Sequence, residues 1–189
     1  DANGTLIAFN DDYTSASASD QQTLTTNNLK PTDSRESAIV AILSPGSYTV
    51  ILRGKTSGTG VVDAYDISGM APAKFGNIST RGKVEMGDNG AMIAGFIVAA
   101  PANQPGTSQR VVIRAIGPSL QSFGVSSALA DPTLDIYLNG VPGKTASQLI
   151  LSNDNWKTNS QTNQQILQSN GLAPSNDKEA AVVMDLDPG

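Results

Sequence analysis

The chain contains 189 residues, of which 39% are hydrophobic and only 15% charged, and its 12 Lys and Arg against 17 Asp and Glu give a formal net charge of −5. This acidic balance, without a basic cluster, argues against a nucleic-acid-binding surface. Because Cys and His are both absent, the chain lacks thiolate metal ligands and the commonest general base, so we expect no catalytic activity. No apolar run approaches the roughly 20 residues that span a bilayer.

Short runs of β-branched and apolar residues, bounded by Gly, Pro, Asn or Asp, follow one another along the chain. This pattern predicts an all-β fold, mainly an antiparallel β-sandwich of the jelly-roll or immunoglobulin-like kind. The predicted strands, in chain order, are 5–9, 37–43, 47–53, 61–67, 82–86, 92–98, 110–116, 133–138, 148–151 and 180–186.

Three segments between these strands predict short helices. Residues 20–29 and 163–172 are polar, lack β-branched runs and end near Asn28 and Gly171, which is typical of a helix that stops at a left-handed residue. A further short helix is predicted over 118–129.

The chain repeats itself. Residues 6–46 align without a gap onto residues 149–189, at a constant offset of 143, with 17 identities in 41 positions. A period of 143 residues has the size of a whole domain, with one or two short helices in each repeat. We therefore divide the chain into residues 1–69, the C-terminal part of one repeat, and residues 70–189, the next repeat without its last two strands.

The two copies continue differently. The first leads into strands 47–53 and 61–67, whereas the second stops at Gly189, so strand 180–186 would expose a backbone edge beside apolar side chains. Either the sequence is a window of a longer tandem polypeptide, or strands of one subunit complete the sheet of the next. The residues predicted to form the interface are Ser47, Tyr48, Val50, Leu52, Ala181 and Val183, together with Tyr13 and Trp156. For these two aromatic residues the alternative is packing over the end of their own sandwich.

Several motifs carry a family resemblance. They are Asn-Ile-Ser-Thr-Arg-Gly at 77–82, Ile-Ala-Gly-Phe-Ile-Val at 93–98, Arg-Val-Val-Ile-Arg-Ala-Ile-Gly-Pro-Ser-Leu at 110–120 and Leu-Ala-Asp-Pro-Thr-Leu at 129–134. Together they resemble a tandem-repeat module of large secreted or cell-surface bacterial proteins. The Asn-Asp-Asn-Trp turn at 153–156 and the Pro-Gly-Ser-Tyr-Thr strand at 45–49 are similar to the bacterial pre-peptidase C-terminal type of β-sandwich. The resemblance implies secretion, an extracellular or cell-surface location and no catalysis.

The acidic turn at the start of each copy is the best ligand candidate. In both copies an Asn-Asp pair leaves a strand, and further acidic residues precede the next one, so hard oxygen ligands could converge on Ca²⁺. The candidate ligands are Asp11, Asp12, Asp33 and Glu36 in the first copy and Asp154, Asn155, Asp177 and Glu179 in the second. The alternative is that these side chains form Asx turns and a helix cap that bind their own backbone.

Other polar residues favour structural roles. Arg110 and Arg114 share one face of a strand and, with Arg81, suit ion pairs better than anion or sugar binding. Ser119 lies in a Gly-Pro-Ser turn and has no His to serve as its base.

These features predict a structural module of an extracellular bacterial fibre, filament or surface stalk, whose partners are copies of itself or adjacent repeats. The alternative is a carbohydrate-binding or adhesin module, or an accessory domain of a secreted hydrolase, with a polysaccharide as its partner.

Overall fold

The computed structural model describes residues 5–68, 75–99, 106–139 and 147–188. The chain divides into two compact units, unit 1 (Asp1–Ser79) and unit 2 (Thr80–Gly189). The domain boundary predicted between residues 69 and 70 falls outside the described residues.

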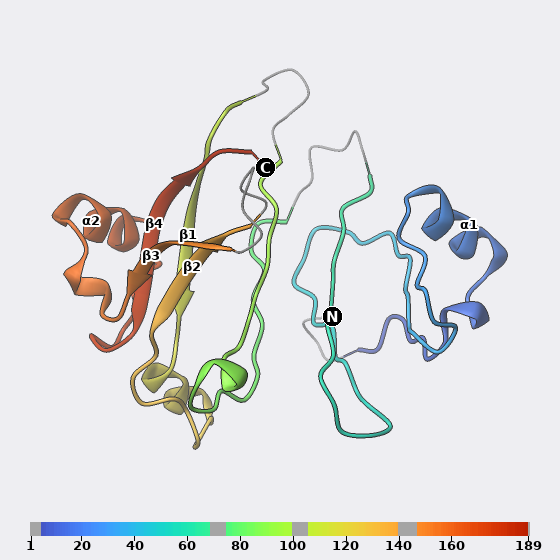
Figure 1. The fold of residues 1–189 in the computed structure, drawn as a ribbon, viewed down its shortest axis with the longest axis horizontal. Coiled ribbons are helices and arrows are strands. Elements are labelled where there is room, and N and C mark those ends of the chain that lie inside the picture. The colour runs from blue at the N-terminus through green and yellow to red at the C-terminus, as the bar shows by residue number, and fades with distance from the viewer. Residues whose placement is uncertain (1–4, 69–74, 100–105, 140–146, 189) are drawn as a thin grey trace. The chain divides into compact units, whose positions relative to one another are not determined.

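Unit 1 holds one α-helix, α1 (Ala18–Thr26), which follows the 3₁₀ turn η1 (Tyr13–Ser15) (Figure 1). The Ser17 side chain caps this helix by accepting a hydrogen bond from the backbone N–H of Asp20 at 3.1 Å. Among the described residues of unit 1, the buried hydrophobic side chains are Tyr13 and Leu24. The unit therefore has a small core around its helix.

Unit 2 is more regular. Its elements, in chain order, are η2 (Asp88–Gly90), β1 (Gln109–Ala115), η3 (Pro118–Phe123), β2 (Leu134–Leu138), β3 (Gln148–Asn153), η4 (Trp156–Thr158), α2 (Gln161–Ser169) and β4 (Ala180–Leu186). The strands form two antiparallel pairs, β1 with β4 and β2 with β3, and α2 lies alongside β4 (Figure 1).

The core of unit 2 lies where α2 and η4 meet β4. Trp156, Leu167, Ala181 and Val183 form a buried cluster, and Val112 of β1 packs against it. Side chains at 181 and 183 share one face of β4 because strand residues two apart point the same way. Pairing with β1 thus supplies both backbone hydrogen bonds and apolar contact to β4.

The predictions for unit 2 succeed where a partner strand lies in the same unit. Strands predicted at 110–116, 133–138, 148–151 and 180–186 correspond to β1, β2, β3 and β4, and the antiparallel arrangement is confirmed. The helices predicted at 20–29 and 163–172 are α1 and α2, each beginning two residues earlier behind a serine cap. The helix predicted over 118–129 is only the 3₁₀ segment η3, which ends at Phe123 and is capped by Gly124 with φ 83°.

Six predicted strands are not formed. Segments 5–9, 37–43, 47–53, 61–67, 82–86 and 92–98 carry no strand pairing in the described part of the chain. Strand propensity favours an extended chain, but a strand exists only when a neighbour accepts its backbone hydrogen bonds. Many of the apolar side chains in these segments are exposed. The described residues accordingly show two small antiparallel sheets and short helices, not the full set of strands expected of a sandwich.

No helix in the described part of the chain combines the length and apolar character needed to cross a membrane.

Candidate functional site

In the acidic turn of each copy, one asparagine side chain makes two hydrogen bonds to the backbone, which we call the asparagine clamp. Asn10 Oδ1 accepts from the N–H of Ala38 at 2.9 Å, and its Nδ2 donates to the carbonyl of Asp12 at 3.0 Å. In the second copy Asn153 makes the same two bonds, to Ala181 at 3.0 Å and to Asn155 at 3.2 Å. This asparagine therefore fixes the chain entering its helix to the segment that follows the helix.

Other bonds also recur at the offset of 143. The backbone N–H of Tyr13 donates to the carbonyl of Glu36 at 2.8 Å, and that of Trp156 donates to the carbonyl of Glu179 at 2.8 Å. Both aromatic side chains are buried. The two copies thus share one set of local hydrogen bonds. Where the copies differ, the difference lies in the residues around these bonds.

The carboxylates proposed as calcium ligands are engaged elsewhere. Asp11 pairs with Lys55, Asp33 with Arg35 and Asp177 with Lys157, each at 2.7 Å, while Asp154 accepts from the side chain of Asn155. The side-chain and backbone N–H groups of Arg35 hold the pKa of the Asp33 carboxyl well below its usual range. Asp12 and Asn155 contribute backbone carbonyls to the asparagine clamp. Across the described residues, no group of three or more His, Cys, Asp or Glu side chains is placed to hold a metal ion.

A chelation experiment tests whether a bound cation stabilises the acidic turns. We expect an excess of EDTA to leave the melting temperature of the chain unchanged, because ion pairs and backbone hydrogen bonds, not a bound cation, hold the acidic turns together. Differential scanning calorimetry with and without added CaCl₂ measures this. A rise in melting temperature with calcium, reversed by EDTA, would restore the metal site.

Glu179 is the most unusual polar residue of unit 2, since its side chain is fully buried. Its Oε1 accepts from the backbone N–H groups of Gly117 at 3.0 Å and Ser119 at 2.9 Å, and from the hydroxyl of Ser119. A Cβ at position 117 would lie 2.4 Å from the carbonyl oxygen of Leu129, so the turn requires glycine there. Glu179 is therefore an anchor for the Gly-Pro-Ser turn that follows β1, a role that the sequence analysis missed.

Glu36, the counterpart of Glu179, lies in a different setting. It is exposed, and its Oε2 accepts from the backbone N–H groups of Thr32 and Asp33 at 3.2 and 3.3 Å. Its Oε1 accepts no hydrogen bond from any described residue of the chain. The oxygen of this carboxylate that corresponds to the buried, triply bonded oxygen of Glu179 thus has no partner in the described part of the chain.

The strand positions that follow the two glutamates differ in the same way. We call residues 36–43 the first acceptor segment and residues 179–186 the second acceptor segment. Val182 of the second is 1% exposed, whereas its counterpart Ile39 is 51% exposed. Val182 pairs with Ile113 of β1, while the first acceptor segment has no strand partner among the described residues.

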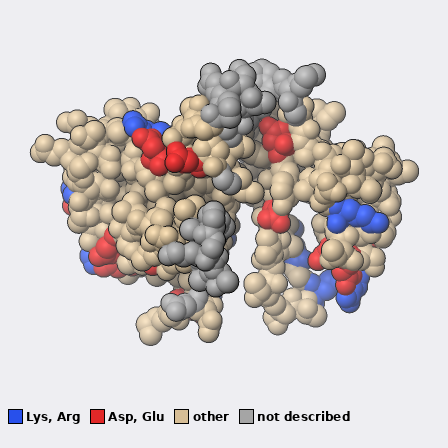
Figure 2. All heavy atoms as spheres, turned by 45° about the horizontal axis from the view of Figure 1, so that its top comes forward, with Lys and Arg blue, Asp and Glu red and all other residues tan. Residues whose placement is uncertain are grey.

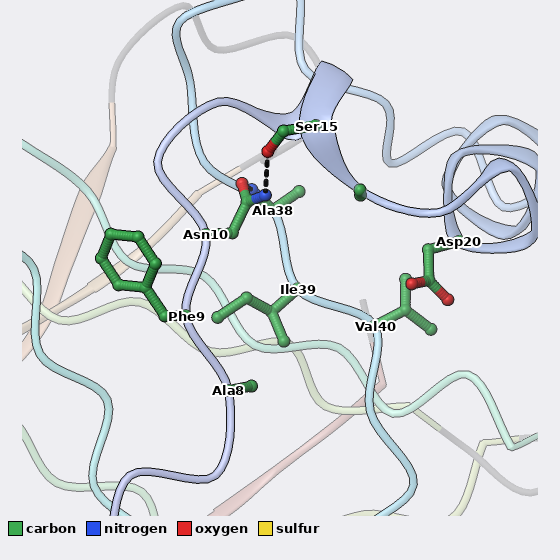
Figure 3. Close-up of a pocket in the computed structure, with 9 residues that line it drawn as sticks. Ala8, Phe9, Asn10, Ser15, Asp20, Ala38, Ile39 and Val40 are labelled. Atoms are coloured by element: carbon green, nitrogen blue, oxygen red, sulfur yellow. Dashed lines mark hydrogen bonds between the residues drawn. The ribbon is translucent and has the colours of Figure 1, made fainter.

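A hollow of about 190 Å³ marks a second difference between the copies (Figure 3). In unit 2, Asn159 and Asn163 donate side-chain hydrogen bonds to the carbonyls of Ala181 and Val183 at 2.8 and 3.4 Å. In unit 1 the corresponding residues are Ala16 and Asp20, which cannot donate in that way. Ala16 and Asp20 instead line the hollow of unit 1, together with Phe9, Asn10 and Ile39.

The residues predicted as an interface fall into two groups. Tyr13, Trp156, Ala181 and Val183 are buried within their own units, where the last three share one cluster. Ser47, Tyr48, Val50 and Leu52 are exposed. Only the second group presents its side chains on the surface of a unit.

Charged residues make local pairs. Arg110 and Asp185 face each other across β1 and β4 with two contacts of 2.7 Å, which lowers the pKa of Asp185, and Arg114 donates to the carbonyl of Leu172 at 3.2 Å. On the visible face, blue and red groups are small and scattered among uncharged side chains (Figure 2).

No family model, no curated protein and no solved structure matches this chain. The resemblance to secreted bacterial repeat modules thus remains a prediction from the motifs.

Proposed function

We propose that the chain is a structural module of an extracellular bacterial fibre, filament or surface stalk, in which repeats join end to end and strands from a neighbouring module or subunit complete each sheet. The observation that carries this proposal is the contrast between the two acceptor segments. One has a strand partner and buried side chains, and the other has neither within the described residues.

Exposed apolar side chains support the same proposal. In unit 1 the segments predicted as strands expose Ile42, Val50, Leu52, Val61 and Tyr65, among others. Exposed apolar side chains that gather in one patch mark an interaction site. An unpaired segment rich in β-branched residues is also a template for another strand. Addition of neighbouring strands would bury these side chains and extend the small sheets into a β-sandwich.

Electron microscopy of the native material tests the proposal. We expect unbranched filaments with an axial repeat of about 40 Å, the diameter of a compact domain of one period. Monodisperse particles of one chain, with no filament at any concentration, would contradict it.

The hollow of unit 1 favours a carbohydrate-binding or adhesin role as the second candidate. It combines the exposed ring of Phe9 with the polar side chains of Asn10 and Asp20 (Figure 3), and ligand sites commonly pair an aromatic surface with a few polar groups. Binding of the chain to immobilised polysaccharides, lost in Phe9→Ala but kept in Phe123→Ala, would favour this role. Phe123 is a matched control because it is equally exposed in unit 2.

A further inference from the structure

The second acceptor segment shows what a complete contact contains. β1 pairs with β4 from Gln109↔Leu186 to Ala115↔Ala180. The turn after β1 then places three donors, from Gly117 and Ser119, on the buried oxygen of Glu179. Val112 adds apolar contact to the cluster around Trp156. Residues 109–119, which are β1 and the Gly-Pro-Ser turn after it, therefore bind as one continuous unit to Glu179 and β4.

The first acceptor segment retains the receiving half of this contact. Glu36 is present, and the asparagine clamp holds Ala38 as it holds Ala181. Among the described residues, no second strand supplies the other half of this contact to residues 36–43. The 189 residues thus contain one β1 strand for two acceptor segments.

We propose that residues 36–43 are a docking site for the β1 strand and Gly-Pro-Ser turn, residues 109–119, of a second copy of this repeat. This inference deepens the proposed function, on which it rests, by naming the contact that joins successive copies. The register follows from unit 2: Val112 lies opposite Val40 and Ile113 opposite Ile39. The N–H groups of Gly117 and Ser119 and the hydroxyl of Ser119 reach the free oxygen of Glu36.

The apolar character of the site matches that of the strand. The docked strand covers Ile39, which is half exposed without it, and Arg114 of the strand reaches the carbonyl of Leu29, the counterpart of Leu172. Burial of apolar side chains and pairing of an open backbone edge both favour docking.

One substitution determines which β1 strand docks. Asp185, the partner of Arg110 in unit 2, corresponds to Ile42 in the first acceptor segment. A β1 strand therefore keeps its ion pair only with its own β4, so the strand already in unit 2 stays there. The occupant is therefore a β1 strand that is not already paired with a β4 strand, such as one supplied by the preceding repeat of a tandem array.

Because the chain has no Cys, an engineered disulfide can report this register. In a chain with a second copy of residues 80–143 placed before Asp1, we combine Val112→Cys in the added copy with Val40→Cys. The backbone N–H and C=O of Ala181 bond to Asn153 and Asn159, away from β1. Ala181 and Val183 therefore form the close, non-hydrogen-bonded pairs with β1. We expect a disulfide yield at least about tenfold above that of the control with Ile113→Cys in the added copy and Val40→Cys.

Val112→Cys with Val183→Cys in the unmodified chain is the positive control, because these residues already face each other. Equal yields for the two test pairs, while the positive control oxidises, would overturn the docking site. If the native material forms filaments but the engineered chain does not form the disulfide at Val40→Cys, the docking site is refuted while the fibre proposal stands. The disulfide without filaments would refute the fibre and leave the docking site standing.

Discussion

Replacing Glu179 by Ala is expected to lower the free energy of unfolding of unit 2 by about 3–5 kcal/mol. The substitution removes the buried acceptor of three hydrogen bonds and leaves the N–H groups of Gly117 and Ser119 without their partner. Trp156 is the single Trp of the chain and is buried in the core of unit 2, so urea unfolding followed by its fluorescence measures unit 2.

Glu36→Ala is the matched control, because Glu36 holds the same place in the first copy but is exposed. We expect it to change stability by less than about 1 kcal/mol, since water replaces the lost acceptor at an exposed site. Thermal unfolding by circular dichroism covers unit 1. Equal losses from the two substitutions would mean that both glutamates serve the same contact within one chain, which would contradict the free oxygen at Glu36.

Val182→Asp is expected to unfold unit 2, at a cost above about 4 kcal/mol, because it buries a charge without a partner. Val182 is almost completely buried within the β1 and β4 pair. The counterpart substitution Ile39→Asp places the same charge on a half-exposed residue, and we expect a change within about 0.5 kcal/mol. Far-ultraviolet circular dichroism and Trp156 fluorescence measure both variants. An Ile39→Asp chain that loses its cooperative transition would show that the first acceptor segment is already packed.

Local signals in the sequence predicted the helices and the paired strands. The polar segments 20–29 and 163–172, which end near Asn28 and Gly171, become α1 and α2 because such signals act within a few residues, and the structure adds the serine caps Ser17 and Ser160. The β-branched run at 180–186 becomes β4 because a complementary run, β1, lies in the same unit.

Nonlocal pairing is what the sequence could not provide. Residues 37–43 have nearly the same apolar pattern as 180–186, yet only the latter forms a strand, since propensity does not supply a partner. The role of Glu179 was missed for the same reason: its donors at Gly117 and Ser119 lie about 60 residues earlier, and its acidic neighbours suggested calcium instead. Its identity with Glu36, at a position followed by a predicted strand, was the available signal.

Native-state hydrogen exchange of the unmodified chain tests most directly whether the two copies of one segment differ in their strand partner. The amides of Val182 and Met184 face β1, so we expect them to exchange at least about a hundredfold more slowly than those of Ile39 and Ala41. Comparable protection at the two pairs of positions, in a monomeric sample, would contradict the account.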